Sequence, residues 1–143
     1  MTEIEFHFNA PDKLSYACRL LRKASASGKR TVVTAAPDML EELDRALWTF
    51  SALDFVAHCH SNAAPAMVAA SPVVLAEALA GTPAHPVAVN LGEGVPAGFE
   101  KFERLIEVVT NDNADRQQAR LRWKHYAQRG YDIQRRDLAG PAA

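Results

Sequence analysis

The sequence is poor in the features that mark several large classes of protein. Two cysteines among 143 residues, Cys18 and Cys59, are too few for a disulfide framework. No run approaches the roughly 18–20 apolar residues of a membrane-spanning helix. The first residues, MTEIEFHFN, lack the basic segment and apolar core of a signal peptide. We therefore expect a cytoplasmic protein with reduced thiols and no membrane contact.

An excess of one charge is also lacking. The 16 Lys and Arg residues nearly balance 17 Asp and Glu, for a net charge of -1, whereas domains that coat nucleic acid are usually strongly basic. The imbalance is local, because residues 114–136 hold seven Arg or Lys and only two Asp. Positive charge concentrated in one segment of a neutral protein indicates an anionic partner for that segment.

No nucleotide-binding or hydrolase motif is complete. Gly28-Lys29-Arg30-Thr31 resembles the end of a phosphate-binding P-loop, but Lys23 stands where its first glycine belongs. The expected order is also reversed, since a P-loop joins a strand to a following helix. No G-x-S-x-G motif occurs, and no pair of carboxylates stands out. We therefore expect that the chain is not an enzyme in itself and binds no cofactor.

The segment His58-Cys59-His60 comes nearest to a metal site. Side chains two residues apart on a strand can share one ion, and Cys18 or His85 could complete the ligand set. A second pair with ligand spacing is missing, however. A structural role for the three residues is therefore favoured, and we expect no metal.

The apolar pattern predicts one α/β domain. Period-two alternation over residues 3–8 and a β-branched run at 31–35 indicate strands, and an amphipathic helical pattern follows each. This order is typical of a mostly parallel sheet with crossover helices. The expected helices span 13–27 and 37–48, a helical turn lies near 99–104, and further strands span 73–75, 87–89, 105–109 and 131–135. A short apolar segment surrounds Phe55-Val56, a loop covers 62–66, and the domain spans 1–137 with a flexible tail at 138–143.

Residues Ala114 to Ile133 form the most unusual segment. The pattern predicts a helix that is capped by Asn111 or Asn113 and stopped by Gly130, then a closing strand. The segment carries five basic residues and two large aromatic residues: Arg116, Arg120, Arg122, Lys124 and Arg129, with Trp123 and Tyr126.

Three of these side chains share one face of the predicted helix. Arg116, Arg120 and Trp123 are spaced i, i+4, i+7, which places them on one side at about 3.6 residues per turn. Guanidinium groups beside an aromatic surface suit an acidic peptide that carries an apolar residue. The alternative is a solvated basic face whose two aromatics lie in the core.

Three motifs along the chain carry a family resemblance. Leu43 to Trp48 (LDRALW) is similar to an L-D-x-x-L-W segment, and Phe55 to His58 stands where F-x-P-H is common, although Ala57 replaces the proline. Ala119 to Tyr131 matches A-R-x-R-[WY]-K-x-Y-x-x-x-G-[FY]. In this order they resemble the chi-subunit family of bacterial DNA polymerase III. The resemblance implies a domain similar to mononucleotide-binding folds but without a P-loop.

The resemblance also implies two protein partners. Chi-like proteins are accessory subunits in DNA replication that link the clamp loader, through the psi subunit, to the acidic C-terminal tail of single-stranded DNA-binding protein. The matching motif assigns Val109, Arg116, Arg120 and Trp123 to binding of this tail, with Lys124 as a charge on the rim. DNA is then contacted only indirectly.

The surface that faces psi is expected around Trp48, Phe55 and His58. Trp is enriched at protein interfaces, although a core or rim aromatic is the plainer interpretation of Trp48. Two other classes of function stay open. One is an α/β enzyme or nucleotide-binding domain that has lost its glycine loop, and the other is a direct nucleic-acid binder whose aromatics stack bases.

Overall fold

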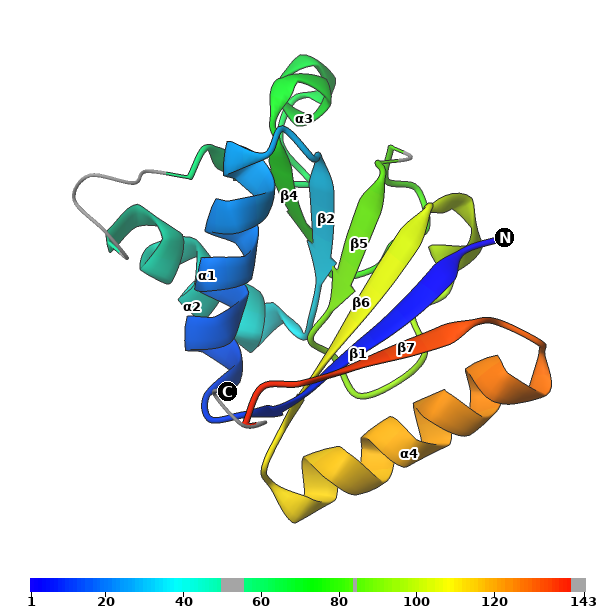
Figure 1. Cartoon of the computed structure of the whole chain (residues 1–143). Helices are drawn as coiled ribbons and strands as arrows, with labels where there is room; N and C mark the ends of the chain where they lie inside the picture. The colour runs from blue at the N-terminus through cyan, green and yellow to red at the C-terminus, as the bar shows by residue number, and fades with distance from the viewer. Residues whose placement is uncertain (50–55, 84, 140–143) are drawn as a thin grey trace.

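A single sheet separates two layers of helices, as Figure 1 shows. The computed structural model describes residues 1–49, 56–83 and 85–139. Its strands are β1 (Glu3–Ala10), β2 (Thr31–Thr34), β3 (His58–His60), β4 (Val73–Ala76), β5 (Val87–Asn90), β6 (Arg104–Thr110) and β7 (Ile133–Asp137). Its helices are α1 (Lys13–Ala26), α2 (Pro37–Thr49), α3 (Pro65–Ala70) and α4 (Asn113–Gln128), with a 3-10 turn, η1, at Phe99–Lys101.

The seven strands of the described ranges lie in the order β3-β4-β2-β5-β6-β1-β7. Every neighbouring pair runs parallel, which confirms the predicted α/β class. In the same ranges, no helix has both the length and the apolar character needed to cross a bilayer.

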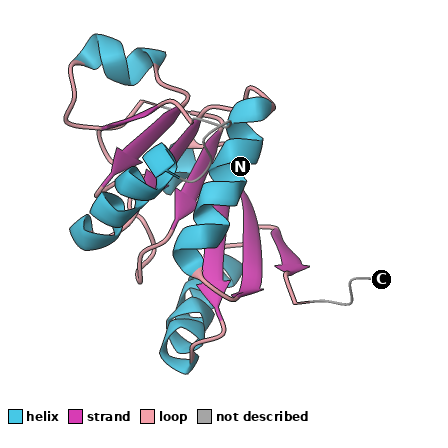
Figure 2. Cartoon of the chain, turned by 90° about the vertical axis from the view of Figure 1, so that its left-hand side faces the viewer, coloured by secondary structure: helices cyan, strands magenta, loops and turns pink. Residues whose placement is uncertain are grey.

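The central strands are buried on both faces because each face has its own helical layer. Val33 and Val73 point into a core with α1 and α2, whereas Val32 and Val74 point into a second core with α4. Figure 2, turned by 90°, shows helices on both sides of the strands. Strands that are buried at every position, such as β2 and β4, are typical of parallel sheets covered on both sides.

Adjacent strands β6 and β1 send the chain to opposite faces. β1 continues into α1, which packs in the first core, while β6 continues into α4, which packs in the second. The backbone of β1 is irregular near this end, where its pairing with β6 shifts between His7 and Ala10 and Asn9 has a φ of 64°. In open parallel sheets, ligands bind beyond the carboxyl ends of strands at such a point.

Among the places where the predicted elements differ from the structure, three have a clear local description. The predicted loop at 62–66 was wrong at its end, because Pro65 occupies the first position of α3, where proline is favoured. The strand predicted at 131–135 begins at Ile133, since the Tyr131 amide still bonds back to the Tyr126 carbonyl at 3.1 Å. The apolar segment around Phe55 lies partly outside the described residues, and the strand that follows it is the three-residue β3.

Candidate functional site

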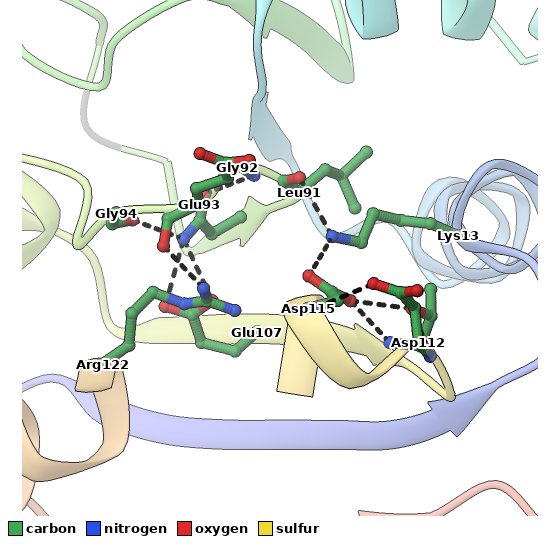
Figure 3. A network of polar contacts seen from close by, with 11 residues as sticks. Lys13, Leu91, Gly92, Glu93, Gly94, Glu107, Asp112, Asp115 and Arg122 are labelled. Atoms are coloured by element: carbon green, nitrogen blue, oxygen red, sulfur yellow. Dashed lines mark hydrogen bonds and ion pairs between the residues drawn. The ribbon is translucent and has the colours of Figure 1, made fainter. Parts of the chain in front are cut away.

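The first turn of α4 is anchored to the end of β6. Asp112 caps the helix, because its carboxylate accepts the Asp115 amide at 3.1 Å. The Asp115 carboxylate in turn accepts the Thr110 amide at 2.8 Å and the Lys13 ammonium at 3.0 Å (Figure 3). Burial would raise the pKa of Asp115, but the bonds from Thr110 and Lys13 outweigh it and lower that pKa. The helix start is therefore fixed to both β6 and α1.

Replacing the cap, Asp112→Ala, is expected to lower the free energy of unfolding by about 1 kcal/mol, as for other capping residues. Chemical denaturation of both proteins measures the difference. The predicted caps Asn111 and Asn113 were wrong, because Asn113 is already the first helical residue. Asn113→Ala is the matched control and should change stability by less than about 0.5 kcal/mol. Equal losses in the two variants would contradict the assignment of the cap.

Arg122 ties the middle of α4 to the sheet. It is 1% exposed, and its Nε donates to Glu107 Oε1 at 2.9 Å on β6. Glu107 is wholly buried and also accepts Asn90 Nδ2 at 3.0 Å and the Tyr126 hydroxyl at 2.5 Å. Burial raises the pKa of Glu107, while the Arg122 charge and these donors act in the opposite direction. Arg122 therefore belongs to the interior.

The same network holds the loop after β5. Arg122 Nη1 donates to the Glu93 carbonyl at 2.7 Å, and Asn90 Nδ2 donates to the Gly94 carbonyl at 3.0 Å. On the other side, Lys13 Nζ donates to the Leu91 carbonyl at 3.3 Å. Figure 3 shows α4 and α1 reaching this loop from two sides. These bonds set the rotation of α4 about its axis, and hence which of its side chains face outward.

With α4 held in this way, a pocket of about 230 Å³ lies between the helix and the ends of β6, β1 and β7. Five apolar and five polar residues line it: Phe6, Phe8, Val109, Ala119 and Trp123, then Asn9, Thr110, Arg116, Arg120 and Arg135. The Phe6 and Trp123 ring centroids are 5.0 Å apart. The volume is below the roughly 300–1,000 Å³ of a pocket for a drug-sized ligand. It suits one or two side chains better than a nucleotide.

The charge of the pocket has one sign. Three arginines line it, and no Asp or Glu is among the described residues that do so. Within the described ranges, the ion pairs of the chain involve other cations, such as Lys13, Arg104 and Arg122. The pocket therefore presents three guanidinium groups that form no ion pair with a carboxylate of those ranges, around an apolar centre. Its chemistry fits an anionic segment that carries an apolar side chain.

Four of the five residues assigned to the tail site come together in this pocket. Val109, Arg116, Arg120 and Trp123 all line it, and Lys124 is exposed on α4 outside it. Sequence reasoning missed the six others, namely Phe6, Phe8, Asn9, Thr110, Ala119 and Arg135. The alternation of Phe6 and Phe8 was visible, but only the strand order shows that they lie beneath α4.

A second group of the assigned residues lies at the end of α2. Trp48 is 58% exposed, and its ring centroid is 5.3 Å from that of His58. The His58 side chain is buried, with Nε2 2.8 Å from Asp44 Oδ1 and Nδ1 2.7 Å from the Val56 carbonyl oxygen. Phe55 lies outside the described residues. In this pair Trp48 offers the surface and His58 supports it from below.

The His58-Cys59-His60 segment is engaged in other contacts. Both ring nitrogens of His58 have protein partners, and His60 Nδ1 accepts the Asn62 amide at 3.2 Å. Cys59 points to the opposite face of the sheet, into the core that contains Val74. Across the ranges 1–49, 56–83 and 85–139, no group of three or more His, Cys, Asp or Glu is placed to hold a metal ion.

Known proteins are similar to this chain over nearly its whole length. The model of the family described as DNA polymerase III chi subunit, HolC, matches residues 1–134, which include every pocket residue except Arg135. The DNA polymerase III subunit chi of Pseudomonas aeruginosa is 29% identical over 139 residues, covering 94% of this chain and 95% of the relative. The chain therefore belongs to the chi-subunit family of DNA polymerase III, an accessory subunit in DNA replication.

Proposed function

We propose that the pocket binds the acidic, phenylalanine-ended C-terminal tail of single-stranded DNA-binding protein. The observation that carries this proposal is the pairing of an apolar centre with three arginines that form no ion pair among the described residues. The terminal phenyl ring lies against Val109 and Trp123. Arg120 binds the terminal carboxylate or an acidic side chain, and Arg116 neutralises acidic residues that precede the phenylalanine. Charge-assisted bonds to guanidinium forks are among the stronger ones in proteins.

In this proposal the chain is an adaptor without catalytic chemistry of its own. Its second partner is psi, which connects it to the clamp loader, and the exposed Trp48 with the buried His58 beneath it supports placing that contact at the end of α2. The two surfaces lie on different elements, α2 and α4. A cytoplasmic location follows from the role in replication.

The alternative of a nucleotide-binding enzyme has less support. The Gly28 turn joins the end of α1 to the start of β2, so it lies at the amino ends of the strands. The arginine-lined pocket lies at their carboxyl ends, and no glycine is among its described lining residues. Glycine-rich phosphate sites need backbone amides at the start of a helix that follows a strand. The alternative of direct nucleic-acid binding is tested together with the proposal.

Titration of a labelled peptide with an acidic sequence ending in phenylalanine tests the tail site. We expect a dissociation constant on the order of micromolar, or roughly -8 kcal/mol. Arg120→Ala should weaken binding about tenfold, because it removes one charge-assisted contact worth roughly 1.5 kcal/mol. Added salt should weaken binding by the wild-type chain as well.

Lys124→Ala is the matched control, since it removes a charge of the same sign four residues along the same helix but outside the pocket. It should change affinity less than threefold, mainly through the association rate. Equal affinity of the wild type and Arg120→Ala would contradict the assignment of this pocket as the tail-binding site. Tight binding of single-stranded DNA alone would favour direct nucleic-acid binding. Turnover of nucleotide would favour a nucleotide-binding enzyme.

A further inference from the structure

One side of the pocket is formed by β7, which carries none of the residues assigned to the tail site. β7 is one of the two edge strands of the sheet and pairs only with β1 among the strands of the described ranges. In that pairing Arg135 stands opposite Phe6. Neighbouring residues in register point to the same face of a sheet. Arg135 therefore shares the face of Phe6, below α4, and lines the pocket.

Arg135 and the arginines of α4 reach the pocket from different elements, a strand of the sheet and the helix that covers it. α4 packs closest against β6, and β1 separates β6 from β7. Neighbouring strands are about 4.8 Å apart, so β6 and β7 are separated by roughly 10 Å. The pocket therefore has a helix wall that carries Arg116 and Arg120 and a strand wall that carries Arg135, with Phe6 and Trp123 also lining it.

We infer that Arg135 is a further binding residue of this site and that it binds an acidic side chain of the peptide upstream of the residue in the pocket. The inference rests on the proposed tail-binding function. A ligand that reaches from Val109 on β6, where the apolar side chain lies, to Arg135 on β7 must span roughly 10 Å, which is about three residues of an extended chain at 3.3 Å each. The acidic residue that Arg135 binds is therefore about three positions before the apolar one.

The chain provides a closely matched control for this inference. Arg136 is the next residue on β7 and is exposed like Arg135, but it stands opposite His7 in the register. Successive side chains of a strand point to opposite faces. Arg136 therefore faces the α1 side, where it lines a different hollow with Glu5 and Leu21. Arg135→Ala and Arg136→Ala change the net charge equally and differ in the face that they alter.

The test measures affinity for the labelled acidic, phenylalanine-ended peptide with the wild type, Arg135→Ala, Arg136→Ala and Arg120→Ala, with a thermal melt of each. Arg135→Ala should weaken binding three- to tenfold, and Arg136→Ala less than twofold. Replacing the acidic residue three positions before the phenylalanine by asparagine should weaken binding to the wild type. The same replacement in the peptide should have little further effect on its affinity for Arg135→Ala, because the interaction between Arg135 and that acidic residue is already lost.

The outcomes separate this inference from the tail site itself. Loss of affinity in Arg120→Ala with equal affinities in Arg135→Ala and Arg136→Ala would overturn the role of Arg135 and leave the tail site in place. No binding by the wild type would overturn both. A larger loss for a single-stranded oligothymidylate than for the peptide in Arg135→Ala would also overturn the inference, since it would assign the residue to nucleic acid.

Discussion

Replacing Glu107 by alanine is expected to lower the free energy of unfolding by about 3–5 kcal/mol, the usual cost of breaking a buried ion pair. Arg122 would keep a guanidinium group that is 1% exposed, with no carboxylate to balance it. The Tyr126 hydroxyl and the Asn90 amide would lose an acceptor as well. Domains of this size are stable by roughly 5–15 kcal/mol. Urea unfolding followed by circular dichroism should therefore show a large shift of the midpoint.

A double variant keeps this prediction testable if Glu107→Ala does not fold. Glu107→Leu with Arg122→Met removes both charges and keeps the volume, an exchange that is often neutral or stabilising for buried pairs. Replacing Arg122 also removes its Nη2, which is buried without a hydrogen-bond partner among the described residues and therefore lowers stability in the wild type. The double variant should be more stable than Glu107→Ala. A double variant that is less stable than the single would contradict the ion pair as the source of the loss.

The matched control is an arginine–glutamate pair nearer the surface. Arg104 Nε lies 3.3 Å from Glu5 Oε2, and both side chains are partly exposed. Arg104→Met should cost less than about 1 kcal/mol, because exposed pairs are solvated and screened. A comparable loss in Arg104→Met and Glu107→Ala would mean that burial is not what makes the Arg122 pair important.

Local sequence patterns predicted most of the elements. β1, α1, β2 and α2 follow from period-two and period-3.6 apolar patterns that span whole elements, with Gly28 at the end of α1. α3 could not be found in this way, because six residues are too few to show a helical period. The strand order was also out of reach, since it depends on contacts between segments far apart in the chain.

At one position of α4 the residue type alone indicates the wrong environment. Arg122 counts as a surface charge by composition, yet it lies in line with Ala119 and Tyr126, the other buried residues of the helix. The spacing i, i+3, i+7 of these three residues was the available signal. It could be used only with the knowledge that Glu107, on a different element, lies opposite to accept the charge.

The pocket shows the same division between local and distant information. Arg116, Arg120 and Trp123 share a helix face, so their spacing alone places them together. Arg135 joins them only through the parallel pairing of β7 with β1, which brings residues 6 and 135 into register. No local pattern contains that register. The helix wall was therefore predictable from the sequence, and the strand wall was not.

Reversing the helix wall, Arg116→Glu with Arg120→Glu, is expected to weaken binding of the acidic, phenylalanine-ended peptide more than 100-fold. Each reversal removes one attraction and adds one repulsion, and two losses of about 1.4 kcal/mol or more, tenfold each, multiply. Stability should change by less than about 0.5 kcal/mol, because both side chains are exposed and the described residues give neither an ion-pair partner. Fluorescence anisotropy and thermal melts measure the two effects.

Lys124→Glu with Arg129→Glu is the matched control, because it makes the same change of charge on α4 and its C-cap residue, at exposed positions outside the pocket. It should weaken binding only a few-fold, and higher salt should shrink that effect, since it acts at long range. Equal losses in the two double variants would mean that the peptide responds to the overall charge of α4 and not to the pocket. A loss confined to the helix-wall variant would indicate that the peptide contacts Arg116 and Arg120 directly, because the two double variants change the net charge equally.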